Sequence, residues 1–162
     1  AFHHARGLRP RLRSLPLDPP GLAEAAAAAG WRAYDESLVL CGELAPMAVA
    51  DAAVEVLAAP DARWMAVASS ADYQTEARRR EKAEGAALLT VPAAWLLLED
   101  AACIFVAADG PLCGMFDLAV RPGARRRGLA RRIMGAAAAW GLAQGATWKF
   151  SQVSATNEAS LA

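Results

Sequence analysis

The sequence is poor in lysine, histidine and cysteine, and it has no long apolar run. It holds two histidines and three cysteines, and its only lysines are Lys82 and Lys149. No stretch of about 18 uncharged apolar residues occurs, and the opening AFHHARG lacks a basic region followed by an apolar core. We therefore expect neither a membrane span nor a secretion signal, no membrane partner, and a cytoplasmic location.

The few cysteines and histidines do not form a metal-binding pattern. Cys41, Cys103 and Cys113 are odd in number, have no CxxC spacing and lie in apolar segments, which is typical of buried free thiols. His3 and His4 are adjacent near one end of the sequence and are interpreted as exposed residues without a role. We therefore expect no metal.

Acidic residues are absent between Leu118 and Asn157, although the whole chain is balanced at 17 basic and 17 acidic residues. The basic residues of this segment are Arg121, Arg125, Arg126, Arg127, Arg131, Arg132 and Lys149. A genome rich in arginine codons explains frequent arginines, but it does not explain the missing acids. The asymmetry predicts a local anionic partner.

The hydrophobic pattern predicts one domain that mixes helices and strands. With 162 residues, of which 56% are hydrophobic and 21% charged, the chain can bury a sizeable core. DPPGLAEAAAAAG reads as a helix that Gly30 ends, and SLVLCGEL and VEVLA read as strands. DARWMAVASS and TEARRREKAEGAALL read as two helices, the second mostly solvated.

The pattern changes after Val91. AAWLLLED, ACIFVAAD and CGMFDLAV are three runs of strand length separated by turn signals, which predicts an antiparallel meander. Residues from Gly128 to Gly141 then carry apolar side chains at helical spacing, with Arg131 and Arg132 on the opposite side. GATWKFSQVSATN predicts one more strand, and NEASLA the first turn of a further helix.

The segment VRPGARRRGLARR lies where the meander ends and the helix begins. The first amides of a helix lack partners within the helix and carry the positive end of its dipole, so this junction predicts an anion site. Neither GxxxxGK[ST] nor GxGxxG is present. The residues Val120, Pro122, Arg125, Gly128 and Ala130 form V-x-P-x-x-R-x-x-G-x-A, which resembles the acyl-coenzyme A signature of the GNAT N-acetyltransferase superfamily, written Q/R-x-x-G-x-G/A.

The resemblance extends from about Ala93 to Ala162 and implies a bacterial GNAT member. It implies an α/β fold with a mixed, mostly antiparallel sheet flanked by helices. Residues 46–162 would form the GNAT domain, with its C-terminal elements missing, and residues 1–45 would belong to a preceding lobe. A domain that lacks those elements would expose apolar surface or pair with a second copy, so a homodimer is one expectation.

The resemblance also implies a binding site for acetyl-CoA as co-substrate. Backbone groups of Leu118 and Val120 would contact the pantetheine arm, and Asn157 would lie near the thioester. The pyrophosphate would meet the amides of the loop and first helical turn, with Arg125 and Arg126 as the main side-chain partners. This phosphate-binding set is Arg125, Arg126, Arg127, Gly128, Leu129 and Ala130.

Acetyl transfer needs a neutral amine, and a lysine-like amine is neutral only about once in 2,500 at pH 7, a penalty of roughly 4.6 kcal/mol. Many relatives carry a glutamate where this chain has Gly114. The remaining candidates for the base are Asp117, whose odd spacing from Gly114 predicts a side chain on the opposite face, and Glu99. Relatives also carry a tyrosine that protonates the thiolate, which would lie beyond Ala162.

The acceptor is a primary amine on a small molecule, a peptide or a protein, and the sequence does not choose among them. Trp64 is interpreted first as a core residue and Tyr73 as a core or rim aromatic, and both are weak candidates to line the acceptor pocket. Two alternatives stay open: a non-catalytic domain that binds or senses acyl-CoA, and an arginine-rich nucleic-acid-binding module. The neutral overall charge and the lack of a known binding motif count against the second, so we expect no nucleic-acid partner.

Overall fold

The structure is a computed structural model that describes residue 5 and residues 10–70 and 75–158. The chain divides into two compact units, Ala1–Glu36 and Ser37–Ala162. The first contains helix α2 (Leu22–Ala28), which Gly30 closes with a positive φ of 81° and an amide that donates to Ala27 O. The predicted helix is confirmed, and the domain boundary after residue 45 stays a prediction.

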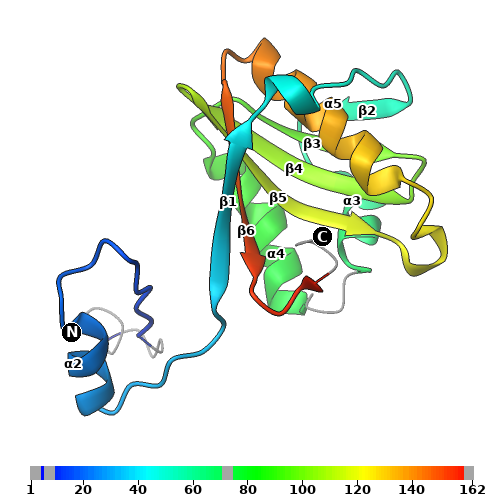
Figure 1. The fold of residues 1–162 in the computed structure, drawn as a ribbon. Coiled ribbons are helices and arrows are strands. Elements are labelled where there is room, and N and C mark those ends of the chain that lie inside the picture. Colours follow the sequence, from blue (N-terminus) through cyan, green and yellow to red (C-terminus); the bar gives the residue numbers. More distant parts are fainter. Residues whose placement is uncertain (1–4, 6–9, 71–74, 159–162) are drawn as a thin grey trace. The chain divides into compact units, whose positions relative to one another are not determined.

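The second unit is built on one six-stranded sheet (Figure 1). Its strands are β1 (Ser37–Glu43), β2 (Val54–Leu57), β3 (Ala93–Leu98), β4 (Ala102–Asp109), β5 (Leu112–Val120) and β6 (Trp148–Ser154). Their spatial order is β1-β6-β5-β4-β3-β2, and every neighbouring pair is antiparallel except β5 and β6, which are parallel. The predicted fold class and the antiparallel meander are confirmed.

Helices cover both faces of this sheet (Figure 1). One face carries α3 (Ala62–Ala68) and α4 (Glu76–Gly85), and the other carries α5 (Leu129–Ala143). Asp61 caps α3 by accepting a hydrogen bond from the Trp64 amide at 2.8 Å, and Thr75 caps α4 in the same way. Three short 3-10 turns complete the unit: η1 (Ala45–Met47), η2 (Ala86–Leu88) and η3 (Pro122–Ala124).

Alternation along the central strands divides the core into two layers. Leu96, Leu98 and Ile104 are buried against α5, whereas Trp95 and Leu97 alternate with them and are buried on the α3 side. Burying one such side chain contributes about 1.5–3 kcal/mol. The central strands are therefore apolar on both faces, which explains why β3 reads as a continuous hydrophobic run.

The strands β5 and β6 diverge soon after they meet. Their parallel pairing covers only Leu112–Gly114 against Trp148–Phe150. Beyond these residues β5 pairs with β4 and β6 pairs with β1. The later part of β5, FDLAV, is therefore separated from β6, and the two strands enclose a wedge-shaped opening in the middle of the sheet.

One prediction about the cysteines is wrong. Cys103 and Cys113 are buried, and burial raises their pKa to about 12 and about 11. Cys41 is exposed instead, because β1 is the outermost strand of the sheet and most of its residues are exposed. Among the described residues, no helix is long and apolar enough to cross a membrane.

Candidate functional site

The junction between β5 and α5 has an exposed backbone with open space beside it. After Val120 the chain passes through η3 and an extended Arg125, and then through Arg126 and Gly128, whose φ angles are 64° and 77°. Gly128 is the N-cap of α5, and no side chain caps the amides there. A Cβ placed on Gly128 would meet no atom within 4 Å. An anion can therefore approach the first amides of the helix closely.

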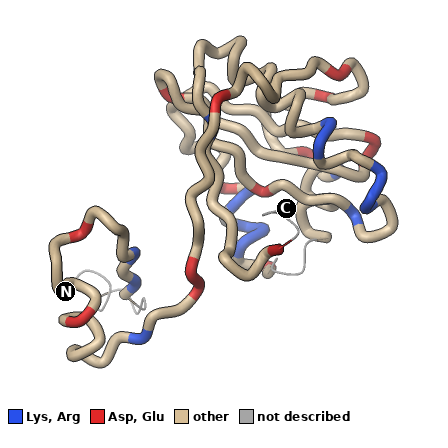
Figure 2. The backbone as a smooth tube through the Cα atoms, in the orientation of Figure 1, with Lys and Arg blue, Asp and Glu red and all other residues tan. Residues whose placement is uncertain are grey.

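The arginines of this junction fall into two groups. Arg132 binds Asp51 at 2.8 Å and Glu99 at 2.7 Å, and Arg127 lies 3.4 Å from Glu99. The hydrogen bond from Arg132 lowers the pKa of Asp51 below its usual range. Within the described ranges, Arg126 and Arg131 make no ion pair, and both are exposed. Figure 2 shows this basic stretch at the end of β5 and the start of α5.

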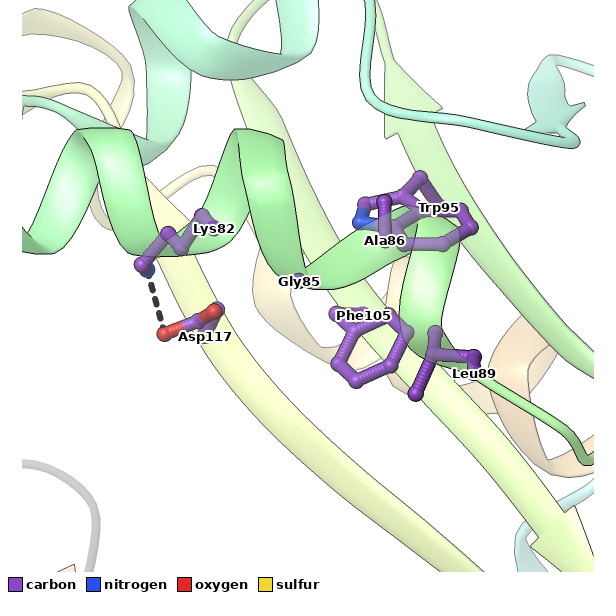
Figure 3. Close-up of a pocket in the computed structure, with 7 residues that line it drawn as sticks. All are labelled: Lys82, Gly85, Ala86, Leu89, Trp95, Phe105 and Asp117. Carbon is purple, nitrogen blue, oxygen red and sulfur yellow. Dashed lines mark ion pairs between the residues drawn. The ribbon is translucent and has the colours of Figure 1, made fainter.

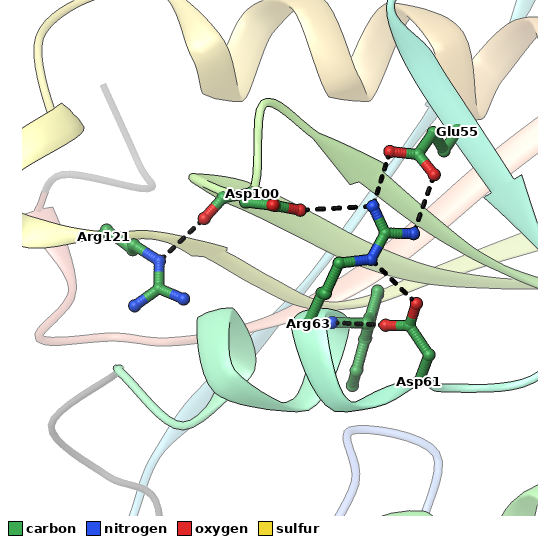
Figure 4. Close-up of polar contacts among 6 residues, drawn as sticks. Glu55, Asp61, Arg63, Asp100 and Arg121 are labelled. Atoms are coloured by element: carbon green, nitrogen blue, oxygen red, sulfur yellow. Dashed lines mark hydrogen bonds and ion pairs between the residues drawn. The ribbon is translucent and has the colours of Figure 1, made fainter.

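Glu99 therefore lies with the arginines and not with Asp117. It occupies the turn between β3 and β4, where it and Asp100 both have positive φ. A second cluster of charged residues holds this turn (Figure 4). Arg63 forms ion pairs with Glu55 at 2.8 Å and with Asp100 at 3.5 Å. Arg121 Nε donates a hydrogen bond to Asp100 O at 2.7 Å. The hydrogen bond from Arg63 lowers the pKa of Glu55.

Asp117 sits in a β-bulge at the edge of the wedge. Phe105 pairs with Phe116 and Cys103 pairs with Ala119, so two residues, Asp117 and Leu118, stand opposite Ile104. Asp117 has a φ of 55°, and the bulge interrupts the alternation of side chains. The prediction that Asp117 faces away from Gly114 is wrong, because the bulge turns its carboxylate toward α4, the side on which Phe116 stacks with Phe105.

The carboxylate of Asp117 contacts the ammonium of Lys82 at the mouth of a small pocket (Figure 3). Lys82 Nζ lies 2.5 Å from Asp117 Oδ1, and the side chains are 15% and 26% exposed. The pocket has a volume of about 190 Å³. Its walls are Lys82, Gly85, Ala86, Leu89, Trp95, Phe105 and Asp117. One opposite-charge pair thus lies among apolar walls.

Sequence reasoning did not identify Lys82. The segment RRREKAEG is dominated by charge, so it reads as a solvated helix. One signal was present, because Lys82, Gly85, Ala86 and Leu89 follow the i, i+3, i+4, i+7 spacing of a single helical face. In the structure these four residues line the pocket together, and Lys82 Nζ also lies 5.9 Å from the centre of a Trp64 ring.

Gly114, where the resemblance to GNAT proteins predicts a glutamate, lies beside a row of aromatic rings. Aromatic rings from four adjacent strands form a row. The ring centroids are 4.9 Å apart between Trp95 and Phe105, 5.9 Å between Phe105 and Phe116, and 5.6 Å between Phe116 and Phe150. A Cβ at Gly114 would overlap the Phe116 ring and lie 3.1 Å from Phe150 Cζ. The place of that side chain is therefore filled by an aromatic ring.

Three further predicted site residues are Trp64, Tyr73 and Asn157. Trp64 is fully buried, and its Nε1 donates to Ile104 O at 3.3 Å, so the hypothesis that it faces an acceptor does not agree with the structure. Tyr73 lies outside the described residues. Asn157 is exposed beyond the end of β6, and its backbone N–H donates a hydrogen bond to Ser154 O at 2.9 Å. Among the described residues, no group of three or more potential ligands could hold a metal.

Comparisons with known proteins point to one superfamily. The family described as "Probable histone acetyltransferase Rv0428c C-terminal" matches residues 1–162. A GCN5-related N-acetyltransferase from Kribbella flavida has a TM-score of 0.55 at 19% identity, over 83% of this chain and 54% of that one. A tandem GNAT protein from the clavulanic acid biosynthesis pathway, determined without AcCoA, has a TM-score of 0.59 at 15% identity, over 91% and 55%.

A GNAT-family protein from Novosphingobium aromaticivorans is similar as well, with a TM-score of 0.53 at 17% identity, over 85% of this chain and 70% of that one. At these identities the solved structures establish a shared fold. The chain spans about half the length of the Kribbella and clavulanic acid pathway proteins. No curated protein matches the sequence.

Proposed function

The chain belongs to the family of the Rv0428c C-terminal domain and to the GNAT superfamily, and from this premise we propose that it transfers an acetyl group from acetyl-CoA to a primary amine. The observation that carries the proposal is the wedge between β5 and β6, which leads directly to the uncapped amides of α5. A strand edge beside a helical anion site suits a ligand that joins amide groups to a pyrophosphate.

The residues around the wedge fit such a ligand. Gly128 leaves open space beside the first amides of α5, and Arg126 adds a positive charge that no described acid neutralises. In the proposed complex these groups hold the pyrophosphate. The backbone of Leu118 and Val120 borders the wedge and would pair with the pantetheine arm, while Asn157 would approach the arm from the end of β6.

This placement brings the reacting thioester near Asp117. The pyrophosphate site follows Val120 in the chain, so a pantetheine arm that runs back along β5 passes Leu118 and reaches the bulge. Asp117 is therefore the proposed proton acceptor for the amine. Glu99 is a poorer candidate, since its carboxylate already binds Arg127 and Arg132 at the anion site.

The proposed reaction is a direct transfer. The acceptor ammonium gives a proton to Asp117, the neutral nitrogen attacks the thioester carbonyl, and the carbon–sulfur bond breaks. The nitrogen, now bonded to the acetyl carbon, gives its second proton to the departing thiolate, so the products are an amide and free coenzyme A, and Asp117 then releases its proton to solvent. General base catalysis of this kind contributes about 10²- to 10⁴-fold in rate. The family description names a histone acetyltransferase, which makes a protein amine one candidate acceptor.

The test separates a catalyst from a binding domain. Calorimetry with acetyl-CoA should detect binding, and a saturating ligand should raise the melting temperature because it binds only the folded state. Thiol release from acetyl-CoA is then followed with a panel of small amines, peptides and histone tails. Binding without turnover on any acceptor would favour the sensing domain. If folded protein does not bind millimolar acetyl-CoA, the proposed function is wrong.

A further inference from the structure

The pocket beside the wedge presents two opposite charges and otherwise apolar walls. Lys82 and Asp117 lie at one side, and Leu89, Trp95 and Phe105 form the rest of the lining together with two small residues of α4 and η2. These two groups contact each other, so a ligand that gives each of them a further partner must carry both charges within one small volume. Neither a purely apolar molecule nor a molecule with a single charge does so.

The ammonium of Lys82 needs further acceptors. Its Nζ atom is buried and contacts Asp117 Oδ1, yet among the described residues no oriented acceptor receives its hydrogens. An ammonium has three donors, and leaving donors unfilled in a buried position is unfavourable. Only Oδ1 of Asp117 is engaged by this contact. Within the described part of the chain the pair is therefore incomplete on both sides: Lys82 can bind an anionic acceptor, and Asp117 Oδ2 can receive a cationic donor.

We propose that the acceptor is a free α-amino acid with an apolar side chain. This inference rests on the proposed acetyl transfer and names its substrate class. The α-ammonium binds Asp117, the carboxylate binds Lys82, and the side chain packs on Trp95, Phe105 and Leu89. An α-amino acid carries its two charges on adjacent groups, which matches two partner charges that are themselves in contact.

Charge and size select against other amines. A diamine or an arginine-like ligand brings a second cation next to Lys82, and bringing like charges together in a partly buried site is unfavourable. The pocket volume of about 190 Å³ lies below the roughly 300–1,000 Å³ typical of sites for drug-sized ligands. The cavity therefore has room for one amino-acid side chain of moderate size.

The same geometry places the amine for reaction. The α-ammonium bound to Asp117 gives its proton to that carboxylate, and the neutral nitrogen attacks the thioester carbonyl. The carbon–sulfur bond breaks, the nitrogen gives its second proton to the sulfur, and an N-acetyl amino acid and coenzyme A leave, after which Asp117 releases its proton to solvent. Lys82 holds the carboxylate throughout and takes no part in the proton transfer, so it is a specificity-determining residue.

The first experiment measures binding without acetyl-CoA, so that it is independent of turnover. Calorimetry with the full 162-residue chain compares leucine, leucinamide, the dipeptide leucyl-glycine and 3-methylbutylamine, which share one side chain and differ in the group beside the amine. We expect leucine to bind at least about tenfold more tightly than each of the others, because only leucine places a free carboxylate on Lys82. Equal binding of leucine and leucyl-glycine would overturn the proposal in favour of a peptide N-terminus.

Variants then test the role of Lys82. Lys82→Met keeps the length of the side chain and should reduce the preference for leucine over leucinamide to less than about twofold, whereas Lys82→Arg should keep part of it. Lys149→Met, which alters the only other lysine, should retain the full preference. Circular dichroism verifies that each variant is folded. A preference that persists in folded Lys82→Met would overturn the proposal.

Turnover distinguishes this inference from the function on which it rests. Thiol release from acetyl-CoA is measured with the same four compounds and with a peptide that carries one ε-amine. Turnover that is fastest with leucine supports the amino-acid class. Binding of acetyl-CoA with faster turnover of the ε-amine overturns the inference and leaves the acetyltransferase intact. Failure to bind acetyl-CoA contradicts the proposed function, while the leucine calorimetry still tests the pocket.

Discussion

The two faces of the sheet differ in how they combine packing with polar chemistry. The α5 face is a continuous apolar core, and its polar features are backbone amides and arginines outside that core, at the start of the helix. The α3 and α4 face has a smaller core, a row of aromatic rings and a pocket that places Lys82 against Asp117. A backbone anion site can thus sit at the rim of a fully packed layer, whereas a side-chain site requires a gap in the packing.

The largest expected effect concerns the pocket face. Asp117→Asn should lower the turnover number by about 10²- to 10⁴-fold, because the amide cannot accept the amine proton, while acetyl-CoA binding stays within a few-fold. Glu99→Gln is the matched control on the other carboxylate, and its turnover number should fall by less than tenfold. Steady-state thiol release provides both values. Equal losses in the two variants would contradict the assignment of the base.

On the α5 face the corresponding change should affect stability. Ile133 is fully buried in the larger core, so Ile133→Ala should lower the free energy of unfolding by about 2–5 kcal/mol. Arg131→Ala on the exposed side of the same helix should change it by less than about 0.5 kcal/mol. Urea denaturation measures both variants. A loss below about 1 kcal/mol for Ile133→Ala would contradict the packing described here.

Placing a glutamate at position 114 should harm this protein. Gly114→Glu forces a side chain into the ring of Phe116 and should cost about 1–3 kcal/mol or more, as overpacking does, without raising the rate of acetyl transfer. Gly114→Ala introduces the same steric contact without the charge and serves as the control. If Gly114→Glu were as stable as the wild type and more active, the aromatic row would not be the reason for the glycine.

A smaller effect is expected at the anion site. Gly128→Glu should weaken acetyl-CoA binding by roughly tenfold relative to Gly128→Gln, because both variants share the strain of a positive φ and the same bulk, and only one repels the phosphates. Arg131→Ala should bind almost as well as the wild type, since Arg131 lies on the outward side of the helix. Calorimetry at constant salt measures all three. Indistinguishable affinities of the two Gly128 variants would argue against an anion at this position.

The smallest effect is a difference in reactivity that leaves the fold intact. Iodoacetamide at pH 8 should label Cys41 in native protein and spare Cys103 and Cys113, because the buried thiols ionise only near pH 12 and pH 11. Raising the pH toward 11 raises the thiolate fraction of Cys113 first. Mass spectrometry after digestion locates the label. Rapid labelling of Cys103 at pH 8 would show that the α3 face opens in solution.

Local pattern predicts most of the elements and the anion site. The helix limits near Gly30 and Gly128 follow from glycine's tolerance of positive φ, and the meander follows from short apolar runs between turn residues. The sequence indicates an anion site at Arg125, Arg126 and Gly128 because these residues lie close together along the chain. Their assigned contacts with acetyl-CoA stay a prediction.

The pocket could not be predicted in the same way. Lys82 and Asp117 are 35 positions apart and meet only because α4 packs near a bulge in β5. Counting odd and even positions along β5 gave the wrong face for Asp117, since the bulge adds a residue that no periodicity reveals. The prediction for Cys41 was also wrong, because this residue lies on an outer strand, whereas Trp64 lies in the core, as its first interpretation had it.

The fold class, the order of the elements and the basic junction that opens α5 follow from the sequence, because those features depend on neighbouring residues and on periodicities of 2 and 3.6. The face that carries Asp117, the lysine that contacts it and the ring that a side chain at position 114 would meet emerge only in the folded protein. Burial, ion pairing and steric exclusion act between atoms brought together from distant segments. Their outcome depends on packing at the scale of a single side chain.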